Sequence, residues 1–73
     1  MPVSLPQVSG REVIKVLQKQ GYHQARTKGS HVMMRGGSGA GVTVPLHNPV
    51  APGTLRAIIA AAGLTVDEFV ALL

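Results

Sequence analysis

Residues 22–47, YHQARTKGSHVMMRGGSGAGVTVPLH, contain the pattern that decides the fold. Within this stretch, residues 22–27 suit a short strand and residues 31–35 suit a second strand. Lys28-Gly29-Ser30 lies between them and supplies turn residues. We therefore expect the two strands to form a hairpin.

The second strand has two distinguishable faces. Val32 and Met34 point to one side, and His31, Met33 and Arg35 point to the other, because side chains alternate along a strand. The second group is the more polar. We therefore expect it to form the open face of the sheet.

A loop and a third strand follow. Residues 36–41 include four glycines and predict a flexible loop. Residues 42–46 alternate apolar side chains with Thr43 and Pro45, which is typical of a strand with one buried face. Because Pro45 has no N–H, we expect this strand to end there or to lie at an edge of the sheet.

A helix is predicted before the strands. Ser9 and Glu12 have the S-x-x-E spacing of a capping box, in which each side chain satisfies a backbone N–H of the other. Apolar residues then follow at helical spacing: Val13, Ile14, Val16 and Leu17. Gly21 is placed to end the helix in a left-handed turn.

Two helices are predicted after the strands. Residues 48–53 form a loop, and Pro52 suits the first position of the next helix. Apolar residues recur there at amphipathic spacing: Leu55, Ile58, Ile59 and Ala62. Gly63 ends this helix, and Thr65 with Glu68 forms a second capping box before a short terminal helix.

This order predicts one α+β domain over residues 1–73. A three-stranded antiparallel sheet with helices on one face is the simplest two-layer solution. Residues 1–8 hold two prolines and no periodic pattern, so we expect them to form an extended N-terminal arm without an assigned role.

Charge and composition narrow the function classes. Seven Lys and Arg stand against three Asp and Glu, a net charge of +4, which favours nucleic acid or an acidic protein as partner. The absence of cysteine excludes disulfides and thiolate metal sites. The start of the chain lacks the pattern of a secretory signal, and the longest apolar run, residues 57–64, is too short to cross a bilayer. We therefore expect a cytoplasmic protein without membrane association.

Several kinds of catalytic site find no support in the sequence. Glu12 is expected to serve a cap, and Asp67 and Glu68 suit the first turn of the last helix. No acid is therefore evident for a Ser-His-Asp triad, and no histidines have metal-ligand spacing. The glycine-rich loop lacks the Lys-Ser/Thr and helix of a phosphate loop. We expect neither a metal nor another cofactor.

Histidine acid–base chemistry remains, and RNA is its natural substrate. Free imidazole titrates near pH ~6.5, and the RNA 2′-OH is a nucleophile beside each phosphodiester. His31 follows the turn, close to a cation and a hydroxyl, and is the best candidate; the alternative is an ordinary strand histidine. His47 ends the third strand. If strands two and three pair, it is placed to approach His31 or a bound phosphate; the alternative is a solvated strand-end histidine. His23 is assigned to the surface.

Two groups of cations are predicted. Arg11, Lys15 and Lys19 recur at i+4 and form a basic stripe on the first helix. This stripe either tracks a phosphate backbone, docks an acidic partner or is simply a solvated helix face. A second cluster surrounds the hairpin and consists of Arg26, Lys28 and Arg35.

The motifs together resemble a known family. Lys28-Gly29-Ser30-His31, then VTVPLH at residues 42–47, then PGTLRAII at residues 52–59 and AGL at residues 62–64 occur in the order seen in HicA toxins of bacterial HicA–HicB toxin–antitoxin pairs. The similarity extends over about residues 9–69. Each motif alone is modest, and their combination in a chain of this length is specific.

The resemblance implies a fold like that of a double-stranded-RNA-binding domain, α-β-β-β-α. It also implies an mRNA interferase, a toxin that cleaves messenger RNA and is neutralised by a HicB-like antitoxin that masks its site. The resemblance further implies that the functional histidine is the one in Gly29-Ser30-His31, and His47 lies in the family's Val-Pro-x-His pattern.

The resulting hypothesis is a metal-independent endoribonuclease with His31 as acid–base catalyst and His47 as the candidate second group. The expected RNA-binding residues are Lys28, Gly29, Ser30, Arg26, Arg35, Lys15 and Lys19. Two alternatives from other classes remain. One is a non-catalytic RNA-binding module, since related folds bind RNA generally without cutting it, and the other is an interaction domain for an acidic protein.

Overall fold

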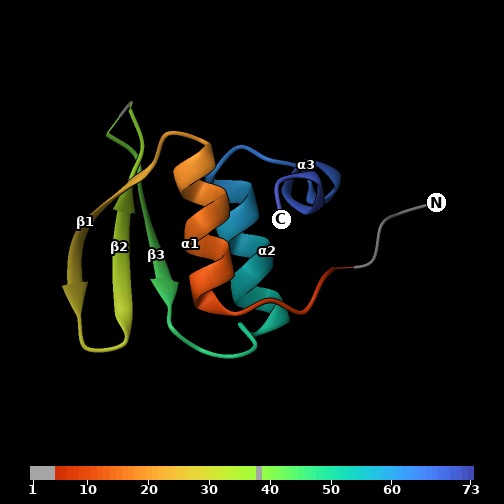
Figure 1. Ribbon diagram of the computed structural model, residues 1–73, viewed down its shortest axis with the longest axis horizontal. Coiled ribbons are helices and arrows are strands. Elements are labelled where there is room, and N and C mark those ends of the chain that lie inside the picture. The colour runs from red at the N-terminus through yellow and green to blue at the C-terminus, as the bar shows by residue number, and fades with distance from the viewer. Residues whose placement is uncertain (1–4, 38) are drawn as a thin grey trace.

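The computed structural model describes residues 5–37 and 39–73. Its elements follow the order α1 (Gly10–Lys19), β1 (His23–Lys28), β2 (His31–Arg35), β3 (Gly41–Pro45), α2 (Pro52–Ala61) and α3 (Val66–Ala71). A three-stranded antiparallel sheet lies beside α1 and α2, and α3 closes the far side (Figure 1). This arrangement confirms the predicted α+β fold, which is like that of a double-stranded-RNA-binding domain.

The strands pair in chain order, β1-β2-β3. β1 and β3 each begin and end one residue away from the predicted bounds, 22–27 and 42–46. Tyr22 instead closes the turn that follows α1, because its N–H donates to the Leu17 carbonyl oxygen (2.9 Å). The edge position predicted for Pro45 is confirmed, since β3 pairs on one side only, with β2.

The turn between β1 and β2 consists of two residues. Lys28 pairs with His31, so Gly29 and Ser30 are the central residues of the hairpin turn. Gly29 has φ 59°, and Ser30 is not in the positive-φ region. This combination is that of a type II′ turn, whose twist matches the flanking strands. The turn therefore fixes where β2, and with it His31, begins.

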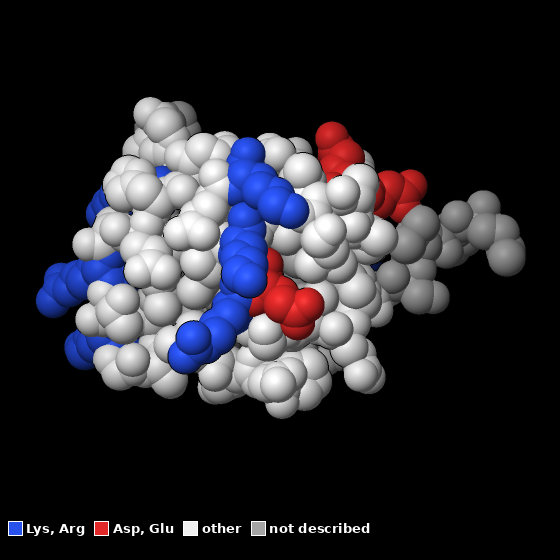
Figure 2. All heavy atoms as spheres, in the orientation of Figure 1, with Lys and Arg blue, Asp and Glu red and all other residues white. Residues whose placement is uncertain are grey.

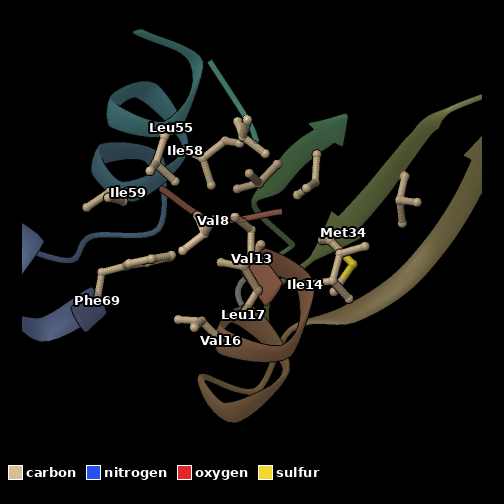
Figure 3. Packing of buried hydrophobic residues seen from close by; sticks show 14 residues of the cluster. Val8, Val13, Ile14, Val16, Leu17, Met34, Leu55, Ile58, Ile59 and Phe69 are labelled. Carbon is tan, nitrogen blue, oxygen red and sulfur yellow. The ribbon is translucent and has the colours of Figure 1, made fainter. Parts of the chain in front are cut away.

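The core lies between the sheet and the helices. From the sheet, Val32 and Met34 are buried, whereas His31 and Arg35 are exposed, which confirms the predicted faces of β2. Figure 3 shows Met34 beside Ile14 of α1, and Phe69 of α3 pointing into the cluster. The core is entirely hydrophobic within the described residues. Burial of each Val, Leu or Phe side chain in it contributes about 1.5–3 kcal/mol to the stability of the fold.

The helix ends agree with the predicted signals. Both capping boxes form, at Ser9 with Glu12 and at Thr65 with Glu68. Gly21 and Gly63 have φ of 89° and 74°, so both helices before them end in a left-handed residue.

The N-terminal arm has a structural role that the sequence did not indicate. Residues 1–4 lie outside the described part of the chain. Val8 is buried in the core, and its carbonyl oxygen accepts a hydrogen bond from the Val50 N–H (2.8 Å). The last residue of the arm is therefore part of the packed fold.

β1 differs from the other two strands because all six of its residues are exposed. α1 and α2 pack against the sheet mainly at β3. A register shift between Gln24 and Arg26 also interrupts the pairing of β1 with β2. β1 thus projects beyond the helix layer, with neither face covered (Figure 1).

Candidate functional site

Three chain segments meet at one end of the sheet. They are the start of β2, the end of β3 and the start of α1, at the lower end of the sheet in Figure 1. The Leu46 N–H donates to the Ser30 carbonyl oxygen (2.7 Å), and the Gly10 N–H donates to the His47 carbonyl oxygen (2.9 Å). These backbone bonds fix the segments that carry the two candidate histidines.

His31 and His47 lie side by side at this end. Their ring centroids are 6.3 Å apart, with the ring planes at 70°. Both side chains are exposed, and neither donates or accepts a hydrogen bond within the described part of the chain. The expectation that strand pairing brings His47 to His31 is therefore confirmed.

The cations of the hairpin lie on the same face of the sheet as His31. Lys28 is directly opposite His31 on the neighbouring strand, and Arg26 is opposite Met33. Arg35 lies at the far end of β2, where its Nη1 donates to the Gly39 carbonyl oxygen (3.2 Å). Lys28 and Arg26 thus lie on β1, across from the strand that carries His31, and Arg35 supports a loop.

The turn residues position the site through their backbone. Gly29 meets the backbone requirement of the turn, and the Ser30 carbonyl holds the end of β3. The Ser30 hydroxyl is exposed and takes part in no protein hydrogen bond among the described residues. Its position directly before His31 leaves it open to a ligand.

The α1 cations lie on the helix side of the sheet, away from the face of His31. Arg11, Lys15 and Lys19 are exposed, and Figure 2 shows Lys and Arg atoms in a row along α1. The Lys19 Nζ donates to the Leu72 carbonyl oxygen (2.6 Å) and thereby caps α3. The fold does not bring Lys15 and Lys19 to the histidines.

Arg11 connects the two regions, and sequence reasoning did not include it among the RNA-binding residues. It lines a hollow of about 160 Å³ together with His47, Leu46 and Ser9. It also lines a larger groove together with Lys15. The i+4 spacing placed Arg11 in the basic stripe, but its proximity to His47 depends on how α1 docks against β3.

Two of the acidic residues serve helix caps. The carboxylates of Glu12 and Glu68 accept hydrogen bonds from the cap residues Ser9 and Thr65. Among residues 5–37 and 39–73, no group of three His, Cys, Asp or Glu is placed to hold a metal ion. No helix in the same residues has the length and apolar character needed to span a membrane.

A comparison with known families identifies the family of the chain. The model of the family described as HicA toxin of bacterial toxin–antitoxin matches residues 10–64. This range includes α1, the three strands, α2 and both candidate histidines. A search of curated proteins finds no match. Because the family model covers most of the 73 residues, the chain belongs to the HicA toxin family of bacterial toxin–antitoxin systems.

Proposed function

We propose that this toxin is a metal-independent endoribonuclease that cleaves mRNA with His31 as its acid–base catalyst. The observation that carries the proposal is the exposed pair of His31 and His47, whose ring centroids are 6.3 Å apart beside the cations of β1. Two imidazoles can hold and release protons on either side of one phosphodiester. His31 is the primary catalyst, and His47 is the second acid–base group.

The chemistry uses the RNA's own nucleophile. One imidazole takes the proton from the 2′-OH, and the 2′-oxygen forms a bond to the adjacent phosphorus. The bond from phosphorus to the 5′-oxygen of the next nucleotide breaks, and the other imidazolium gives its proton to that oxygen. The products are a 2′,3′-cyclic phosphate and a 5′-hydroxyl, and no oxidant, reductant or water is consumed.

Cations on the open face assist this reaction. Lys28 opposite His31 and Arg26 opposite Met33 supply positive charge where the phosphorane gains negative charge. Gly29 and Ser30 lie next to His31 in the turn and border the bound phosphate. Arg35, Lys15 and Lys19 lie farther from the histidine pair and attract the parts of the RNA that extend beyond the scissile bond.

The neutralising partner is a HicB-like antitoxin. A net charge of +4, with its cations on the open sheet face and along α1, favours an acidic surface on that protein. Covering the histidine pair would exclude RNA. Because mRNA is the substrate, the toxin acts in the cytoplasm.

Replacement of His31 tests the proposal. We expect His31→Ala to lower RNA cleavage by about 10²–10⁴-fold, the usual contribution of a general acid–base group, and to abolish growth arrest. Because His31 is exposed, thermal unfolding and RNA binding should change little. The matched control is His23→Ala, an exposed histidine opposite Arg35 at the other end of the sheet, which should keep full activity.

Two further measurements separate this mechanism from other nuclease mechanisms. A single 2′-deoxy nucleotide at the cleavage position should block cutting, because it removes the nucleophile. A metal chelator should leave the rate unchanged. If His31→Ala still cuts RNA at the wild-type rate, or if the deoxy substrate is cut, the proposal is wrong.

The alternative function is a non-catalytic RNA-binding module. The row of exposed cations on α1, remote from His31, is the feature that favours it. Under that alternative the purified wild type binds RNA without cutting it. Toxicity would then survive His31→Ala and fall when Lys15 is neutralised.

A further inference from the structure

An uncovered groove lies between α1 and β1. Because the helices do not cover β1, the helix-side surface of this strand stays open beside α1. The groove, termed the α1–β1 groove, has a volume of about 460 Å³. Its walls are formed by Arg11, Lys15 and Gln18 of α1 and by Gln24 and Thr27 of β1. This volume falls within the ~300–1,000 Å³ typical of small-ligand sites.

The chemistry of the groove suits a nucleotide. Two cations line its α1 wall, and none of the described residues that line it is acidic. Gln18 and Gln24 each offer amide donors and an acceptor, and neither side chain takes part in a hydrogen bond among the described residues. The apolar side chains of Ile14, Val32 and Leu46 provide a surface for a base. The cations suit a phosphate, the amides suit the edge of a base, and the apolar side chains suit the face of a base.

The groove is continuous with the candidate catalytic site. Arg11 and Leu46 line the groove, and the same two residues line the hollow that contains His47. His47 in turn lies beside His31. A strand leaving the histidine pair therefore reaches the groove by passing the N-terminal end of α1.

We propose that the α1–β1 groove is a nucleotide-binding subsite for RNA next to the scissile bond. Arg11 and Lys15 hold its phosphates, and Gln18 and Gln24 contact the base. The proposal rests on the proposed ribonuclease function for the origin of the bound RNA. It assigns to the helix side of the sheet a role in substrate selection, separate from the chemistry on the open face.

RNA is favoured over an acidic peptide as occupant for two reasons. The groove leads to the histidine pair, which binds an RNA phosphodiester under the proposed function. Its amide side chains are suited to base edges, since single-stranded RNA is read by hydrogen bonds to unstacked bases.

Binding without cleavage provides the test. His31→Ala serves as the background, and a short single-stranded RNA is titrated over a range of salt concentrations. Arg11→Gln with Lys15→Gln should weaken binding about tenfold and reduce the salt slope by about 1.4, at ~0.7 per lost phosphate contact. The control is Arg56→Gln, an exposed arginine on α2 that lines neither hollow and should have little effect.

The base contact is tested separately. Gln18→Met and Gln24→Met keep side-chain length but remove the amide. We expect them to change the relative affinity for RNAs that differ at one base by about fivefold or more, with overall affinity less affected.

The outcomes distinguish this inference from the proposed function. The groove inference fails, and the nuclease proposal stands, if the wild type cuts RNA while the groove substitutions behave as Arg56→Gln does. That comparison covers binding in the His31→Ala background and cutting in the chain that keeps His31. If no RNA is cut but binding still depends on Arg11 and Lys15, the subsite stands and the nuclease proposal fails. If the groove variants lose only affinity for an acidic antitoxin, the groove is a protein-binding site and the inference is overturned.

Discussion

At Gly10 the backbone of α1 lies close to the end of β3. Gly10 is buried, and a Cβ at this position would collide with the Pro45 carbonyl oxygen and lie 2.9 Å from the Leu46 Cα. Both neighbours belong to the backbone, so neither can move without shifting β3. Because the Gly10 N–H also holds the His47 carbonyl, this approach decides where His47 lies.

Gly10→Ala should therefore destabilise the fold and impair the site together. We expect a loss of about 1–3 kcal/mol in the free energy of unfolding, the usual cost of overpacking, measured by urea denaturation. RNA cleavage should fall in the fraction that remains folded, because His47 moves relative to His31.

Gly53→Ala is the matched control for Gly10→Ala. Gly53 is exposed in α2, and a Cβ there would meet no atom within 4 Å. Since alanine restricts the unfolded chain, this change should stabilise the protein by about 0.4–1 kcal/mol. Equal effects of the two substitutions would contradict the close approach at Gly10.

Among the elements, α3 depends most on its N-terminal cap. It has only six residues, and such a short helix is not stable alone in water. The Thr65 hydroxyl accepts a hydrogen bond from the Glu68 N–H (3.1 Å), and the Glu68 carboxylate accepts one from the Thr65 N–H (2.9 Å). The cap holds the first turn of α3 in place and so helps to present Phe69 to the core.

Thr65→Ala should lower the free energy of unfolding by about 1 kcal/mol, the usual effect of losing a threonine cap. Thermal or urea unfolding measures this loss. Thr54→Ala is the control, because Thr54 is an exposed threonine within α2 whose hydroxyl makes no hydrogen bond among the described residues. A threonine-to-alanine effect that is the same at both positions would argue against the cap.

Local features of the helices and strands could be predicted from the sequence. Both capping boxes, the helix ends at Gly21 and Gly63 and the buried face of β2 were correctly predicted, because each depends on residues a few positions apart. The approach of His47 to His31 was predicted conditionally and needed only the pairing of neighbouring strands.

The remaining features depend on packing between distant segments. The burial of Val8, the close approach at Gly10 and the position of Arg11 beside His47 all follow from how α1 and the arm dock against the end of β3 and the loop after it. No local pattern encodes these contacts. The bond from Lys19 to Leu72 joins residues 53 positions apart and was missed for the same reason.

At the scale of the whole molecule, stability depends on a small core. A chain of 73 residues has a total stability of roughly 4–11 kcal/mol, at ~0.05–0.15 kcal/mol per residue. Phe69, 1% exposed, is the largest fully buried side chain and joins α3 to the cluster around α1 (Figure 3). Few other contacts can compensate for its loss.

Phe69→Ala should cost about 3–5 kcal/mol and leave much of the protein unfolded near 37 °C. Circular dichroism during heating measures this effect. Val70→Ala is the control on the same helix, since Val70 is 36% exposed and its truncation should change stability by about 0.5 kcal/mol or less. A cooperative transition at the wild-type temperature for Phe69→Ala would show that α3 is dispensable.

The exposure of β1 on both faces has a consequence for local opening. Regions with few buried apolar contacts open at low free energy, whereas Val32, Met34 and Val44 tie β2 and β3 to the core. The amide hydrogens of β1 should therefore exchange with solvent faster than those shared between β2 and β3. Under the proposed function, Lys28 and Arg26 would therefore lie on a strand that adapts to RNAs of different shape, whereas His31 lies on β2, which is tied to the core.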